Sequence, residues 1–210
     1  MCIRDSYNVL LRACARAGDV TRAGDVMREI QASPRLENPS DRSWRECLRA
    51  AATARQADDA ERIWREGISY HREHRLVVDE PQQRWIPSVQ SLQALLMAYI
   101  READATVDDL ERKRELYERV VLSYHDVLTG EREMGFYRLD PMEMLDDRLS
   151  ITLVIHALAA LRGMVDINRE AELCEIGHPL LQLDCLQGEP SLSRTAQQDV
   201  DALQSWCRLR

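Results

Sequence analysis

The chain has 210 residues, a mass of 24.2 kDa and a formal net charge of −8. This length suits one domain or a short stack of repeats. With 45% hydrophobic, 30% charged and only 5% aromatic residues, the composition favours helices built on Leu and Ala over a β-sandwich. No apolar run approaches the roughly 18 to 20 residues that a membrane-spanning helix needs, so we expect no membrane partner.

The negative charge is concentrated in the later part of the chain. Residues 1–75 hold 14 arginines and 12 acidic residues, a net charge of +2, whereas residues 76–210 hold 14 basic and 24 acidic residues, a net charge of −10. Because basic side chains supply most of the affinity for phosphates, we expect any nucleic-acid contact in the first third of the chain. Every basic residue except Lys113 is an arginine, which suits planar, bidentate binding of phosphates and bases.

Residues 7–31 predict a hairpin of two short helices. Apolar residues recur at helical spacing on both sides of Gly18, which ends the first run. Pro34 and Pro39 end the second helix, because proline cannot donate an amide and disfavours helical geometry in the residue before it. Residues 1–6 enter this pattern without a cap, and we interpret them as a non-native leader on a chain that extends further.

A second unit repeats the spacing of the first. It runs from Trp44 to Trp64, with a turn predicted near Arg55. Four pairs of apolar residues share one offset of 37 positions: Tyr7 with Trp44, Leu11 with Leu48, Ala23 with Ala60, and Met27 with Trp64. A constant offset across both helices indicates an internal repeat, so residues 7–75 are predicted to form two helical-hairpin repeats.

The remaining sequence predicts longer and less regular repeats. An elongated third repeat covers residues 76–128, with its hairpin after Pro87, and residues 129–148 form a loop or insertion. Residues 149–210 predict a degenerate fourth hairpin and a closing helix that covers the last exposed apolar face. The predicted fold class is therefore all-α, an α-solenoid of stacked helix-turn-helix repeats whose core forms between neighbouring hairpins.

The run from Ser6 to Ala23 closely resembles the pentatricopeptide repeat. It contains Tyr7-Asn8-Val9-Leu10-Leu11, a helix of small residues, an Arg-Ala-Gly turn at residues 16–18 and an alanine in the second helix. The second unit keeps the spacing but loses the turn glycine, and residues 86–92 resemble the family's Pro-Asp-Val junction between repeats. The tetratricopeptide repeat is the nearest alternative, but no segment shows its Trp-x-x-Leu-Gly-x-x-Tyr pattern.

The resemblance implies a set of RNA-binding residues. In the pentatricopeptide family, each repeat reads one RNA base through a residue just after the first-helix aromatic residue and another at the end of the repeat. Carried over to this sequence, these positions are Asn8 with Ser40 in the first repeat, Arg45 with Ser88 in the second, and Gln93 in the third. Asn8 with Ser40 is a polar pair that would favour a pyrimidine. Arg45 and Gln93 depart from the family's usual residues, which puts base readout in their repeats in doubt.

Each of these residues also has a purely structural interpretation. Asn8 could lie on a solvated helix face, and Ser40 could be the N-cap of a helix that begins near Asp41. Arg45 could pair with a neighbouring carboxylate, or it could bind a phosphate without reading a base. The sequence leaves these alternatives open.

Catalytic and metal-binding patterns are weak in this sequence. His71-x-x-His74 places two histidines on one helix face, but no further ligand lies nearby. The acidic pairs 58–59, 108–109 and 146–147 coincide with predicted helix starts, where acidic residues are favourable, and so do not indicate a two-metal nuclease. No phosphate-binding glycine motif or nucleophile elbow occurs. We therefore expect no enzymatic activity, metal, cofactor or small-molecule substrate.

The sequence leaves two hypotheses of function. In the first, the protein binds single-stranded RNA and acts in transcript processing, stability or translation in an organelle, with the mitochondrion preferred to the plastid by family analogy. In the second, it is a structural subunit or protein-interaction scaffold of a mitochondrial ribonucleoprotein such as the ribosome, with ribosomal proteins as partners. The atypical residues at the base-reading positions and the acidic later repeats favour the second hypothesis.

Overall fold

The computed structural model describes residues 3–33, 39–73, 88–129, 147–162, 164–165, 167–181 and 194–208, and within them all regular structure is α-helix. The all-α prediction is therefore confirmed for the described residues. The helices are α1 (Ile3–Ala17), α2 (Val20–Ala32), α3 (Asp41–Ala54), α4 (Ala57–Glu73), α5 (Val89–Ala105), α6 (Leu110–Thr129), α8 (Arg148–Leu161), α9 (Ile167–Leu180) and α10 (Arg194–Arg208). Residues 76–87, the start of the predicted third repeat, and residues 130–146, most of the predicted loop at 129–148, lie outside the described residues.

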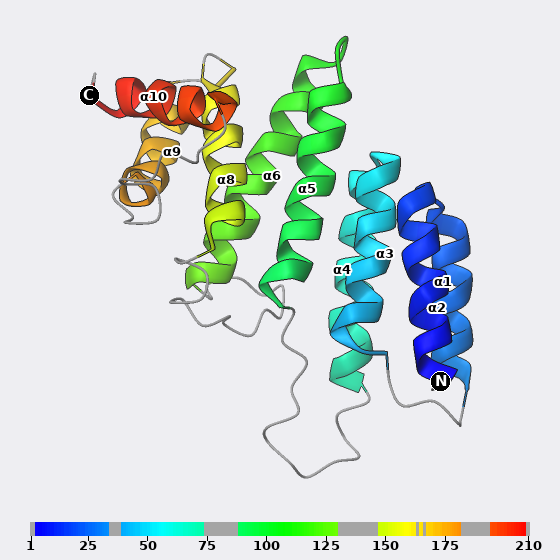
Figure 1. Cartoon of the computed structure of the whole chain (residues 1–210). Coiled ribbons are helices and arrows are strands. Elements are labelled where there is room, and N and C mark those ends of the chain that lie inside the picture. The colour runs from blue at the N-terminus through cyan, green and yellow to red at the C-terminus, as the bar shows by residue number, and fades with distance from the viewer. Residues whose placement is uncertain are drawn as a thin grey trace.

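The helices form hairpins that stack side by side in two layers. Helices α1, α3, α5 and α8 form one layer, which we call the A layer, and α1 packs on α3, α3 on α5, and α5 on α8. Helices α2, α4, α6 and α9 form the other layer, the B layer, and each packs against its own A-layer partner. Helix α10 packs on α8 and α9 at the end of the row (Figure 1). The arrangement is a row of helical hairpins, as the repeat pattern predicts.

A recurring cap starts the A-layer helices. Ser40, Ser88 and Asp147 are the N-caps of α3, α5 and α8, and each side chain accepts a hydrogen bond from the backbone N–H of a serine three residues later. Such a cap satisfies one of the backbone donors that a helix leaves unpaired at its start. The caps are 48 and 59 residues apart, so the second and third repeat periods are longer than the first period of 37.

The turns within the first two hairpins use the same backbone conformation with different residues. Gly18 has a φ of +68°, and a Cβ atom there would lie 3.2 Å from the backbone N of Ala54. Arg55 occupies the corresponding turn with φ 59° and ψ 47°. This left-handed conformation costs a non-glycine residue roughly 1 to 2 kcal/mol. The second repeat nevertheless keeps the same turn with Arg55 in place of glycine.

The core lies between the layers and between neighbouring hairpins. Of the repeat-related residues, Trp44 and Trp64 are almost completely buried, as are Leu11, Leu48 and Ala60. The apolar positions that define the 37-residue offset are therefore core positions in the first two repeats. No described helix is long and apolar enough to span a membrane.

A charged cluster fastens the closing helix. Nδ1 of His156 on α8 lies 2.9 Å from Oδ2 of Asp199 on α10, and Nε2 lies 3.4 Å from Oδ1 of Asp104 on α5. The hydroxyl of Tyr117 on α6 donates to the same Asp104 oxygen at 2.5 Å. Only a protonated imidazole can donate to both carboxylates. Burial disfavours the charged ring, but the carboxylates of Asp199 and Asp104 outweigh burial and raise the pKa of His156 above 6.5.

This cluster predicts that the protein loses stability as the solution becomes alkaline. Because the pKa of His156 is raised in the folded state, its contribution is complete below the unfolded value of 6.5 and is lost as the pH rises through the folded value. Urea unfolding between about pH 6 and pH 9 should show a larger fall in the free energy of unfolding for the wild type than for His156→Gln. Equal slopes for the two proteins would contradict this assignment.

Candidate nucleic-acid interface

The predicted base-reading residues of the first repeat lie between α1 and α3. The hydroxyl of Ser43 donates to Oδ1 of Asn8 at 3.2 Å. Ser40 is the N-cap of α3, and its hydroxyl lies 3.1 Å from that of Ser43. The structural interpretation of Ser40 is therefore confirmed, and Asn8 bonds across to the next A-layer helix.

Similar hydrogen bonds join the later A-layer helices. The hydroxyl and backbone N–H of Ser88 donate to the carboxylate of Asp41 at 2.7 and 3.0 Å, and the hydroxyl of Ser91 donates to it at 2.8 Å. The side-chain amide of Gln93 donates to both carboxylate oxygens of Asp147, at 2.9 and 3.0 Å. Together with the Asn8 contact, these bonds form a line along the N-terminal ends of the A-layer helices, which we call the polar seam.

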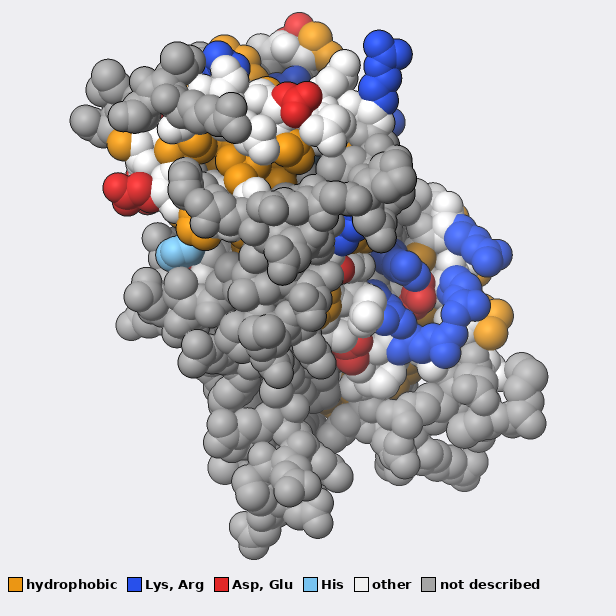
Figure 2. Space-filling view, turned by 60° about the vertical axis from the view of Figure 1, so that its left-hand side comes forward, with side chains coloured by type: hydrophobic (Ala, Val, Ile, Leu, Met, Phe, Trp, Pro, Cys, Tyr) orange, Lys and Arg blue, Asp and Glu red, His pale blue; other side chains and the backbone are white. Residues whose placement is uncertain are grey.

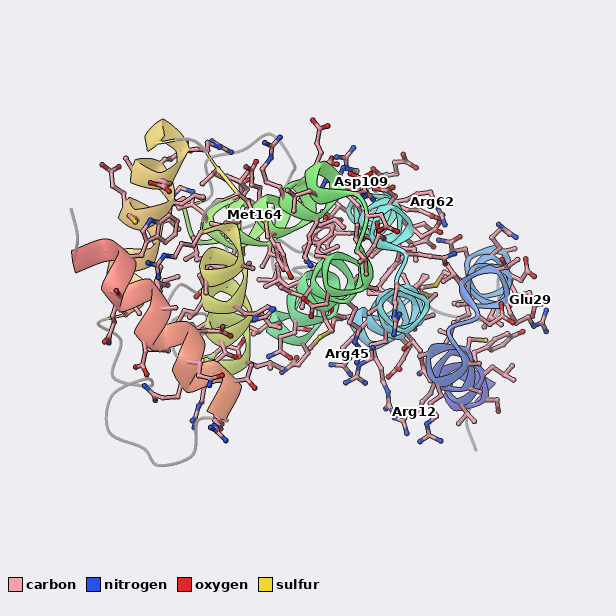
Figure 3. All side chains as sticks on the ribbon, turned by 90° about the horizontal axis from the view of Figure 1, so that it is seen from above. Arg12, Glu29, Arg45, Arg62, Asp109 and Met164 are labelled. Carbon is pink, nitrogen blue, oxygen red and sulfur yellow. The ribbon has the colours of Figure 1, made fainter. Side chains whose placement is uncertain are left out.

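Four of the five residues predicted to contact RNA form hydrogen bonds in the polar seam: Asn8, Ser40, Ser88 and Gln93. A base could bind these groups only by sharing or replacing their hydrogen bonds within the protein, which weakens their use for base discrimination. Arg45, the fifth residue, is half-buried, and its Nε atom is buried without a hydrogen-bond partner. It lies on the same side of the helix row as Arg12 (Figure 3).

A groove of about 490 Å³ crosses the outer face of the A layer. Figure 2 shows basic side chains gathered on this side of the molecule. We call it the basic groove and define it by the charged and polar side chains that line it: Arg12 and Arg16 of α1, Glu46, Arg49 and Thr53 of α3, and Gln90, Gln93 and Arg101 of α5. An adjoining hollow of about 460 Å³ shares Thr53 and Arg101 with the groove and adds Arg55, Asp104 and Ala105.

The arginines of the basic groove are largely unneutralised. Among the described residues of its lining, Glu46 is the one acidic residue; it is only 2% exposed and lies 3.5 Å from Arg49. Arg101 donates to the backbone carbonyl of Ala52 at 3.4 Å. Within the described part of the chain, Arg12 and Arg16 have no ion-pair partner. Four arginines against one buried carboxylate make the groove a positively charged surface suited to phosphates.

Arginines on the B-layer side are instead paired with carboxylates. Arg112 lies 2.8 Å from both Asp58 and Glu102, and Arg119 lies 2.9 Å from both Asp58 and Glu61. The hydrogen bond from Arg112 is the main reason that the pKa of Asp58 lies below its ordinary value. This network links α4, α5 and α6 and leaves little free positive charge. The two faces of the row therefore differ in electrostatic character although both are rich in arginine.

The sequence prediction missed most of the groove. Arg12 and Arg49 are related by the same offset of 37 as the apolar pairs, and this equivalence is the signal that could have identified them. Arg101 corresponds to Thr53 at the 48-residue offset between the caps of α3 and α5, so it shows no repeat signal. The groove also extends past residue 75, beyond the first third in which nucleic-acid contacts were expected.

The acidic pairs lie at helix starts in the described residues, where the sequence placed them. Asp58 and Asp59 lie in the first turn of α4, Asp109 accepts from the backbone N–H of Arg112 at 2.8 Å, and Asp147 caps α8. Among the described residues, no three His, Cys, Asp or Glu side chains are arranged to hold a metal ion. The side chains of the His71-x-x-His74 motif lie outside the described part.

Of the five residues that the pentatricopeptide resemblance predicts to contact RNA, Gln93 alone is among the described residues that line the basic groove. The resemblance itself covers one clear repeat, residues 6–23, and a second that shares its spacing. Comparison of the chain with protein-family models, with curated proteins and with solved structures finds no match in any of the three.

Proposed function

We propose that this protein binds single-stranded RNA through the basic groove, as a repeat protein of the pentatricopeptide type and without catalysing a reaction. The observation that carries this proposal is the contrast between the two faces. Arg112 and Arg119 of the B layer are neutralised in an ion-pair network, whereas the groove arginines Arg12, Arg16, Arg49 and Arg101 face only the buried Glu46 among the described carboxylates. A groove that keeps its positive charge free is suited to a polyanionic ligand.

The lining of the groove supports a binding mode dominated by phosphates. None of its described lining residues is aromatic, so bases have no ring on which to stack. The polar seam already engages Asn8, Ser88 and Gln93 within the protein. Affinity should therefore come from arginine–phosphate contacts and vary little with base sequence. The family resemblance adds RNA as the polyanion and an organelle, the mitochondrion before the plastid, as the compartment.

Fluorescence anisotropy with labelled single-stranded RNA tests the proposal. We expect a dissociation constant in the micromolar range at about 50 mM NaCl, similar for oligonucleotides of different sequence, because phosphate contacts supply non-specific affinity of this order. The Asn8→Ala variant should bind almost as tightly as the wild type, whereas Arg49→Ala should bind more weakly. Absence of binding up to about 100 μM protein at this salt concentration would overturn the proposal.

One observation favours a second function, that of a scaffold in a ribonucleoprotein such as a mitochondrial ribosome. The hydrogen bonds of the polar seam make the base-reading positions structural, and the B-layer side presents exposed carboxylates such as Glu111 and Asp58. On this account, partner proteins would bind the B-layer side. Co-sedimentation with ribosomal particles that persists in variants lacking the groove arginines, together with no binding of free RNA, would favour the scaffold.

A further inference from the structure

The turn of the second hairpin holds an arginine in a backbone conformation that favours glycine. In the described part of the chain, Arg55 is the one non-glycine residue with a positive φ. The offset of 37 relates it to Gly18, which makes the same turn in the first hairpin. Glycine reaches this conformation without steric cost, whereas arginine does not. The second repeat therefore bears a conformational cost that a glycine at this position would remove.

The contacts of Arg55 within the protein do not explain why an arginine occupies this turn. Its backbone N–H bonds to the carbonyl oxygens of Ala51 and Ala52, and a glycine would form the same bonds. Its side chain is exposed and, among the described residues, forms no hydrogen bond or ion pair. A residue that keeps a costly backbone conformation without a structural contact is a candidate for a binding role.

The side chain of Arg55 lines the adjoining hollow together with Arg101. Arg101 also lines the basic groove, so the hollow continues the positively charged surface of the groove. Nη1 of Arg101 donates to the carbonyl oxygen of Ala52 at 3.4 Å, and its other N–H donors have no partner among the described residues. The hollow therefore offers unused donors from two guanidinium groups.

Asp104 is the one carboxylate in the described lining of the hollow. Its Oδ1 atom accepts a hydrogen bond from the hydroxyl of Tyr117 at 2.5 Å and lies 3.4 Å from Nε2 of His156. The charge of Asp104 is thus engaged by donors from α6 and α8. Two arginines against one engaged carboxylate leave the hollow with a positive charge suited to an anion.

We propose that Arg55 and Arg101 together bind one phosphate of the RNA strand in the adjoining hollow. This inference rests on the proposed function, and it identifies a residue pair that holds the strand where the basic groove meets the hollow. A planar guanidinium group presents paired N–H donors to phosphate oxygens, so two such groups suit a single phosphate. On this account, the second repeat gives up the stability of a glycine turn in exchange for a binding residue.

The variant Arg55→Gly tests the proposal, because stability and affinity should change in opposite directions. The melting temperature, followed by circular dichroism, should rise by about 2 to 4 °C, since glycine removes the cost of the left-handed turn. The affinity for single-stranded RNA at about 50 mM NaCl, measured by fluorescence anisotropy, should fall about tenfold with the loss of one charge-assisted contact. A residue with a purely structural role would not separate the two quantities in this way.

Two further variants serve as controls. Arg55→Lys keeps the positive charge but not the planar group, and it should lose less affinity than Arg55→Gly does. Arg62→Ala removes one positive charge from an exposed residue of α4, on the B-layer side, and should change the affinity by less than about twofold.

The outcomes separate this inference from the proposed function. If Arg55→Gly binds RNA as tightly as the wild type while Arg49→Ala binds more weakly, the arginine pair is wrong and the basic groove stands. If the wild type does not bind RNA, both proposals are wrong. A lower melting temperature for Arg55→Gly would contradict the conformational cost on which the inference depends.

Discussion

Reversing two groove charges, in the double variant Arg12→Glu/Arg16→Glu, should weaken binding of single-stranded RNA about 100-fold at low salt. Each arginine–phosphate contact is a charge-assisted hydrogen bond worth roughly 1.5 kcal/mol or more, and losing two of them corresponds to about two orders of magnitude in affinity. Both residues are exposed and, among the described residues, have no ion-pair partner to lose, so the fold should be retained. Anisotropy titration gives the affinity, and far-UV circular dichroism reports on the fold.

The matched control for this variant is Arg28→Glu/Arg62→Glu. It changes the net charge by the same amount, but it does so on α2 and α4 of the B layer, where Arg28 contacts Asp25 and Arg62 contacts Asp59. Exposed pairs of this kind contribute about 0 to 1 kcal/mol each, so the control should remain folded. We expect its RNA affinity to fall by less than about tenfold, through the loss of overall charge alone. Equal losses in the two double variants would show that the groove is not the binding surface.

Replacing Trp44 by alanine should remove about 3 to 5 kcal/mol from the free energy of unfolding. The side chain is 2% exposed, and its ring centroid lies 6.2 Å from that of Tyr70 on α4, the other helix of the same hairpin. The substitution leaves a cavity that rigid helices on several sides cannot fill. Because small proteins have a total stability of about 5 to 15 kcal/mol, much of the margin would be lost.

Urea unfolding followed by circular dichroism measures the Trp44→Ala effect. The transition midpoint should fall with little change in the dependence on urea concentration. Leu110→Ala removes an exposed apolar side chain and should change stability by less than about 0.5 kcal/mol. A loss below about 1 kcal/mol for Trp44→Ala would mean that the first two repeats do not pack as described.

Local patterns predicted the helices well. Gly18 marks the turn of the first hairpin, and Ser40 starts α3 as its N-cap. Such signals act within one turn of helix, so a single sequence carries them in full. The 37-residue offset likewise identified Trp44 and Trp64 as core residues, because a repeated interface requires repeated side chains.

The site was harder to predict because it depends on contacts between distant residues. Asp41 and Ser88 meet only because α3 packs on α5. The two long connections also change the repeat period, which hides the equivalence of Ser40 and Ser88 in the sequence. Arg101 and Arg49 line one groove but occupy different repeat positions, since the equivalent of Arg101 in α3 is Thr53. The neutral state of the B-layer face depends on Arg112 reaching Asp58 across 54 positions. Charge counts along the chain cannot distinguish these paired arginines from the free ones.

The dependence of RNA affinity on salt tests the central claim most directly. If four arginines each bind one phosphate of a single strand, the logarithm of the association constant should fall with log [NaCl] with a slope of about −2.8, or about −0.7 per contact. The double variant Arg12→Glu/Arg16→Glu should reduce this slope to about half. A slope near zero for the wild type, or one that the double variant leaves unchanged, would contradict binding through the basic groove.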